Sequence, residues 1–192
     1  MISIAVLRDD SGIEGKRRVR RIVLLTIIVV TILLDQGTKT LVRASLREAE
    51  PRHYAGGLLT ILYAENPGAF LSLGAQLPRA VRRIVFDGLV GLGLLVALWI
   101  LVTGRMTGRG DDIALALVIG GGVGNLLDRA LFHGAVTDFL YLSAGPLHTG
   151  VFNIADMAIT GGVLWLALSS LWPKRRLEAS DPAGKDAGVP NG

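Results

Sequence analysis

Four long apolar runs, separated by short polar stretches, constrain the fold of this 192-residue chain more than any other feature. Each run approaches the roughly 20 residues that a helix needs to cross the hydrocarbon core of a bilayer. None of them alternates between apolar and polar residues as a strand of a membrane barrel does. The runs cover residues 22–34 (continuing to residue 42), 84–102, 113–127 and 154–172. The pattern predicts an all-α membrane protein in which residues 19–173 form a domain of four transmembrane helices.

Composition narrows the possible functions. The chain contains no cysteine, which excludes disulfides, thiol nucleophiles, thiolate zinc sites and iron–sulfur clusters. Its net charge of +4 has the sign that nucleic acid attracts. However, neither of the longer segments between the runs interleaves basic with aromatic residues, so no nucleic-acid partner is predicted.

Basic clusters orient the runs, because positively charged flanks stay on the cytoplasmic side. Arg79, Arg82 and Arg83 oppose the favoured orientation, since they would lie at the outer end of the second run. Three clusters support it and place both termini inside: Lys16-Arg17-Arg18 with Arg20-Arg21, Arg105 with Arg109, and Lys174-Arg175-Arg176.

The two ends of the chain are polar. Residues 1–18 are expected to form a cytoplasmic N-terminal tail, disordered over 1–15, and residues 174–192 a basic and then disordered cytoplasmic tail. The first run also resembles a secretory signal, but no small-x-small cleavage site follows it, so an uncleaved span is favoured.

This topology leaves two segments on the outer side, residues 43–83 and 133–152. The first contains a short β-like stretch at 58–63 and then the turn-forming Asn66-Pro67-Gly68. Within the third run, Gly120 and Gly124 form a small-xxx-small face at which helices can approach closely.

Polar residues from separate stretches fall at one depth, near the outer face. A charged side chain at the centre of a bilayer costs about 2.5–3.5 kcal/mol, so several at one level indicate a function. Structural alternatives remain for some of them: an intrahelical Asp35–Lys39 pair, a loop held by Asp128, and an N-cap at Asn153. The residues in this layer are Asp35, Lys39, Asn125, Asp128, Arg129, Asp138 and Asp156. Asp87, at the start of the second run, has no evident partner in the sequence and fits a first-turn acid.

Asp138 and Asp156 are the least easily explained by structure alone, because neither has a basic neighbour in the sequence. Two carboxyl groups held close together retain one proton, so one can activate water while the other polarises a carbonyl group. A proton relay or ion pathway uses the same residue types. A serine hydrolase built from Ser72 or Ser143 with His133 or His148 is less favoured, since no Gly-x-Ser-x-Gly elbow is present.

Four sequence blocks resemble signal peptidase II, the bacterial membrane aspartyl protease family. They are Asp35-Gln36-Gly37-Thr38-Lys39; Asn66-Pro67-Gly68-Ala69-Phe70; residues 121–129 with Val136-Thr137-Asp138-Phe139; and Phe152-Asn153-Ile154-Ala155-Asp156. The resemblance implies a catalytic dyad of Asp138 and Asp156. It also implies supporting or substrate-binding roles for Asp35, Lys39, Asn66, Gly121, Asn125, Asp128, Arg129, Asn153 and Ala155.

The same resemblance predicts an endopeptidase of the bacterial cytoplasmic membrane that needs no metal or organic cofactor. Its substrate would be a prolipoprotein with a diacylglyceryl-modified cysteine, cut just before that cysteine near the outer face of the membrane. A small β-sheet platform from the first outer segment would lie on the membrane surface, in contact with lipid, and a monomer is expected. The alternatives from other classes are a small proton-coupled transporter and a non-catalytic helical bundle.

Overall fold

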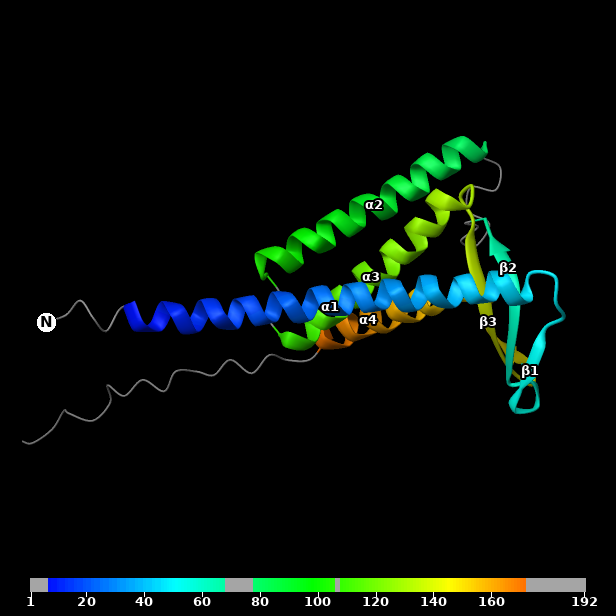
Figure 1. Ribbon diagram of the computed structural model, residues 1–192, viewed down its shortest axis with the longest axis horizontal. Helices are drawn as coiled ribbons and strands as arrows, with labels where there is room; N and C mark the ends of the chain where they lie inside the picture. The colour runs from blue at the N-terminus through cyan, green and yellow to red at the C-terminus, as the bar shows by residue number, and fades with distance from the viewer. Residues whose placement is uncertain (1–6, 68–77, 106–107, 172–192) are drawn as a thin grey trace, which may run out of the picture.

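The protein is mostly helical and carries a small antiparallel sheet at one end of its helices (Figure 1). The computed structural model describes residues 7–67, 78–105 and 108–171. In chain order the elements are α1 (Leu7–Leu46), β1 (Arg52–Tyr54), a 3-10 helix η1 (Ala55–Gly57), β2 (Leu59–Asn66), α2 (Arg79–Thr103), α3 (Arg109–Leu131), β3 (Val136–Ala144), β4 (Leu147–His148) and α4 (Ile154–Leu171).

The first three predicted apolar runs each lie within one helix, and the fourth lies in α4 up to Leu171, where the described residues end. Within the described residues, α3 and α4 are long and apolar enough to cross a membrane, and the apolar part of α2, Asp87–Thr103, is shorter. Large apolar side chains point outward all along the helices, among them Leu33, Leu95 and Leu168. The helical class is therefore confirmed, whereas the count of four spans stays a prediction.

Helix α1 is longer than the sequence indicated. It begins at Leu7, so the prediction of disorder over residues 1–15 is wrong for residues 7–15. The physical reason is that extending an existing helix adds one hydrogen bond per residue fixed, without a new nucleation step. Further along α1, Arg20 ties the helix to the start of α3 through two hydrogen bonds to Asp112, at 2.7 and 2.6 Å.

Helix α3 is the centre of the bundle and contacts all three other helices. Glycines make these contacts close. A Cβ atom at Gly120 would lie 2.8 Å from Cβ of Thr31 on α1, and one at Gly124 would lie 2.6 Å from Oδ2 of Asp35. The predicted small-xxx-small face is thus confirmed as the α1–α3 contact. Leu24, Ala97, Leu101, Leu115, Ala116 and Ile119 form the apolar core between α1, α2 and α3.

The sheet has the order β1-β2-β3-β4, and all its pairs are antiparallel. The first outer segment supplies β1 and β2, as predicted, but the second supplies β3 and β4, which was not predicted. Strand β3 is rich in β-branched and aromatic residues, which favour strands, and turn residues lie at both ends of the second outer segment. It was missed because its partner, β2, is far away in the sequence. Figure 1 shows the sheet at the C-terminal end of α1, where Val42 and Leu46 pack on Phe139 of β3.

Candidate active site

Asp156 lies in the first turn of α4, where its carboxylate caps the helix. The backbone N–H of Asp156 donates to Oδ1 of Asn153 at 2.9 Å, and the backbone N–H of Asn153 donates to Oδ2 of Asp156 at 3.2 Å. This reciprocal arrangement is a capping box, so the predicted N-cap at Asn153 is confirmed. The helix N-terminus also favours a negative charge at this position. The cap therefore fixes both the place and the direction of the Asp156 carboxylate.

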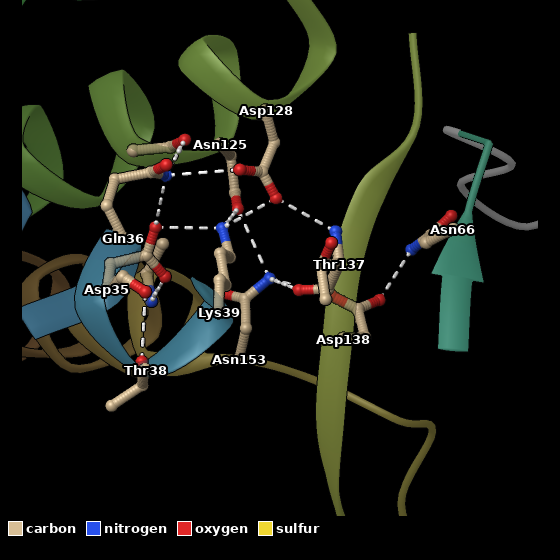
Figure 2. A network of polar contacts seen from close by, with 12 residues as sticks. Asp35, Gln36, Thr38, Lys39, Asn66, Asn125, Asp128, Thr137, Asp138 and Asn153 are labelled. Carbon is tan, nitrogen blue, oxygen red and sulfur yellow. Dashed lines mark hydrogen bonds and ion pairs between the residues drawn. The ribbon is translucent and has the colours of Figure 1, made fainter. Parts of the chain in front are cut away.

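Asp138 lies on β3 and is only 2% exposed. Its Oδ1 accepts a hydrogen bond from Nδ2 of Asn153 at 2.6 Å, and its Oδ2 accepts one from Nδ2 of Asn66 at 3.1 Å. Asn66 ends β2, whose Ala64 pairs with Asp138 across the ladder. Figure 2 shows Asn66 and Asp138 pointing toward one another from the two strands.

Two asparagines connect the two acids. Asn153 is hydrogen-bonded to both, through its side chain to Asp138 and through its backbone N–H to Asp156. Asn125, on α3, donates from Nδ2 to Oδ1 of Asp156 at 2.8 Å and accepts from Nδ2 of Asn153 at 3.2 Å. Among the described residues, amides hold both carboxyl groups, and no cation forms an ion pair with either of them.

The pKa of Asp138 is raised to about 6, chiefly by burial and to a smaller extent by the charge of Asp156. Hydrogen bonds from Asn66 and Asn153 and the charge of Lys39 act in the opposite direction. A carboxyl group with this pKa can hold or release a proton near neutral pH, as acid–base chemistry requires.

Behind the two acids lies a buried ion pair. Nζ of Lys39 lies 2.8 Å from Oδ2 of Asp35 and 2.9 Å from Oδ1 of Asn125, and both charged side chains are fully buried (Figure 2). The intrahelical pair expected from the sequence is thus present. Asp35 also accepts the backbone N–H of Ala155 at 3.0 Å, so α1 caps the start of α4. The pair therefore positions the helix that carries Asp156.

Asp128, fully buried at the end of α3, holds the start of β3. Its Oδ2 accepts the backbone N–H of Thr137 at 2.9 Å, and its Oδ1 accepts Nη2 of Arg43 at 2.7 Å and Nε2 of Gln36 at 3.2 Å. This is the loop-holding role that the sequence left open for Asp128. Gly121 serves the neighbouring contact: a Cβ atom there would lie 2.5 Å from the carbonyl oxygen of Ala155.

The structure brings together most of the predicted site residues, and Arg129 lies beside α2. Nε of Arg129 lies 3.7 Å from Oδ1 of Asp87 on α2, so Asp87, expected to have no evident partner, has one. The sequence could not reveal this pair because the two residues are far apart in the chain.

Three further residues belong to the network and were missed: Gln36, Arg43 and Thr137. For Arg43 a signal was available, because residues 35, 39 and 43 are spaced four apart and fall on one helix face. The other two left no comparable pattern.

The residues of the alternative serine site are described only in part. Ser143 lies opposite His148 in the β3–β4 ladder, toward the end of β3 away from Asp138. Ser72 lies outside the described residues, as do Gly68 and the side chains of Arg79, Arg82 and Arg83. In the described part of the chain, no three His, Asp or Glu side chains converge as metal ligands would.

The chain is similar in sequence to known proteins. The family described as Signal peptidase (SPase) II matches residues 27–172. The lipoprotein signal peptidase of Methylobacterium radiotolerans is 37% identical over 171 residues, covering 84% of this chain and 93% of that protein. That of Syntrophus aciditrophicus is 37% identical over 142 residues, covering 74% and 88%.

Solved structures share the fold. One reported as a bacterial membrane enzyme structure superposes with a TM-score of 0.68 at 23% identity, covering 78% of this chain and 92% of that one. A second gives a TM-score of 0.65 at the same identity. Taken with the family match and the relatives, these results show that the chain belongs to the signal peptidase II family.

Proposed function

We propose that this protein removes the signal peptide from diacylglyceryl-modified prolipoproteins, with Asp138 and Asp156 as its catalytic residues. The observation that carries the proposal is that Asn153 is hydrogen-bonded to both carboxyl groups at the start of α4. Family membership supports the substrate class, since the relatives are lipoprotein signal peptidases.

The proposed chemistry is hydrolysis by water held between the two acids. The ionised carboxylate accepts a proton as the water oxygen attacks the carbonyl carbon, while the protonated one polarises the carbonyl oxygen. When the tetrahedral intermediate collapses, the C–N bond breaks and a dyad proton goes to the leaving amine. The raised pKa of Asp138 supports its holding the shared proton at slightly acidic pH.

The supporting residues hold this arrangement rather than react. Asn66, Asn125 and Asn153 orient the acids, and Asp35 with Lys39 and Asp128 fixes the elements that carry them. Gly121 and Ala155 allow α3 and α4 to approach. We assign Arg129 to substrate binding or support only by resemblance to the family.

The membrane arrangement follows as part of the proposal. Four spans with both termini in the cytoplasm would place the sheet and the dyad near the outer face. A lipid-modified cysteine is held there by its acyl chains, so the scissile bond would meet the dyad without entering the hydrocarbon core. The sheet would rest among lipid headgroups, and the enzyme would act as a monomer without a metal or organic cofactor.

The test is cleavage of a lipid-modified precursor by the purified protein, with Asp138→Asn and Asp156→Asn as variants. Each substitution keeps the shape of the side chain and removes the carboxylate, so we expect cutting to be lost with folding retained. Glu48→Gln, an exposed position after α1, is the control and should cut as wild type does. Normal turnover by either dyad variant would refute the assignment.

The proton-coupled transporter and the non-catalytic bundle are not proposed further, because the chain belongs to a peptidase family.

A further inference from the structure

Arg43 joins three elements near the site without touching either proposed catalytic acid. It lies near the end of α1, with its side chain 17% exposed. Its Nε donates to Oγ1 of Thr137 at 2.9 Å, and its Nη2 donates to Oδ1 of Asp128 at 2.7 Å. Its guanidinium carbon lies 3.9 Å from the centre of the Phe132 ring, at the end of α3. A planar, forked group can make these contacts at once, which an ammonium group cannot.

Thr137 is the residue on which these contacts converge. Its hydroxyl accepts from Arg43, its backbone N–H donates to Asp128 at 2.9 Å, and its carbonyl oxygen accepts Nδ2 of Asn153 at 3.4 Å. It is 3% exposed. Its hydroxyl oxygen, backbone N–H and carbonyl oxygen are therefore held by α1, α3 and the residue before α4.

Asp138 follows Thr137 directly, and successive side chains of a strand point to opposite faces. Arg43 therefore acts from the face away from Asp138. The charges on this side balance, since Arg43 and Lys39 oppose Asp35 and Asp128.

We propose that Arg43 is a positioning residue, which through the Thr137 hydroxyl and Asp128 holds β3 so that Asp138 keeps its place beside Asp156. This inference rests on the proposed function. A displacement of a reacting group by about 1 Å can cost on the order of a hundredfold in rate, so a modest loosening of Thr137 should be measurable.

The test compares Thr137→Val, which removes the hydroxyl at nearly equal volume, with Thr137→Ser, which retains it. We expect Thr137→Val to lower kcat about tenfold with KM unchanged, because the substrate contacts remain. Thr137→Ser should retain kcat within about twofold of wild type. These variants leave all charges in place, so they test the proposal even if an Arg43 variant fails to fold.

Arg43→Gln and Arg43→Lys complete the experiment. Both should lower kcat. Adding Thr137→Val to the Arg43→Gln variant should lower kcat by less than about twofold more, because Arg43→Gln has already removed the hydrogen bond that the two residues share. The matched control is Arg47→Gln, four residues further along the chain and directly after the end of α1. Arg47 is 66% exposed and lies 3.7 Å from Glu65, so its loss should leave kcat unchanged.

The outcomes separate the two proposals. If Asp138→Asn or Asp156→Asn cuts normally, the proposed dyad fails. If both are inactive while Thr137→Val and Arg43→Gln keep wild-type kcat, only the positioning role fails. A rise in KM at unchanged kcat, or equal losses for Thr137→Ser and Thr137→Val, would also overturn the positioning role.

Discussion

Asp138 combines burial with hydrogen bonds from two amides and a nearby negative charge, and the balance raises its pKa to about 6. The folded chain therefore binds this proton more tightly than the unfolded chain does. Between about pH 4 and pH 6 the folded state carries the extra proton, so the contribution of Asp138 to stability falls as the pH rises through this window.

We predict that wild type loses about 1–2 kcal/mol of stability relative to Asp138→Asn as the pH rises from about 4 to 7. The variant cannot ionise at this position, so the difference isolates Asp138 from other titrating groups. Thermal unfolding midpoints of both proteins in detergent, measured across this range, give the comparison. Wild type gaining stability relative to the variant with rising pH would contradict the prediction.

Asp35 has a different role, because it is fully buried, pairs with Lys39 and accepts the backbone N–H of Ala155. Removing one partner of a buried ion pair costs about 3 kcal/mol, although Asp128, 3.4 Å from Nζ of Lys39, still compensates part of the lysine charge here. We therefore predict that Asp35→Asn unfolds at a lower temperature and loses part of its activity. Full activity with an unchanged midpoint would mean that the Asp35 charge is dispensable.

At the scale of elements, the α3–α4 contact sets where Asp156 lies. A Cβ atom at Gly121 would meet the carbonyl oxygen of Ala155 at 2.5 Å, and backbone cannot move aside as a flexible side chain can. Gly121→Ala should therefore displace the start of α4, and with it the Asp156 carboxylate. Because a small displacement of a reacting group slows the reaction strongly, we expect cleavage to fall at least about tenfold. The reduction should appear in kcat.

Gly161→Ala on α4 is the matched control for Gly121→Ala. No atom outside the neighbouring backbone lies within 4 Å of a Cβ atom at Gly161, and alanine favours helix. This variant should cut as wild type does. Equal activity of Gly121→Ala and Gly161→Ala would show that α4 tolerates a shift at the site.

The elements also show what the sequence could and could not predict. The apolar runs predicted the helices, because the length and the apolar character of a run can be read from neighbouring residues in the sequence. Asp35 with Lys39 and the cap at Asn153 were equally readable, since their partners lie within four residues. Strand β3 was missed because it pairs with β2 across the whole of α2 and α3. The Arg129–Asp87 pair and the role of Arg43 depend on the same long-range packing.

At the scale of the whole molecule, apolar side chains face outward along the helices and the polar network lies inside. Within the described residues, no buried side-chain nitrogen or oxygen lacks a hydrogen-bond partner. The charged groups of the network converge where α1, α3 and α4 meet the sheet, while leucines along the helices face outward. Such a distribution suits a bundle surrounded by lipid, in which unpaired polar groups are costly.

The proposed topology can be tested directly, because the chain has no cysteine of its own. Single cysteines at Lys16, Glu48, Arg105, Leu147 and Lys174 lie before, between and after the four apolar runs of the sequence in turn. If all four cross the membrane with both termini inside, a membrane-impermeant maleimide should label only Glu48→Cys and Leu147→Cys in intact cells.

Permeabilised cells supply the control, since all five positions should then react, and each variant should still process precursor. Labelling of Lys16→Cys, Arg105→Cys and Lys174→Cys alone would reverse the orientation. If two successive positions behaved alike, the helix between them would not cross the membrane. Only alternation at every step agrees with the arrangement that brings a lipid-anchored cysteine to Asp138 and Asp156, because the sheet and the dyad then share the outer level with Glu48 and Leu147.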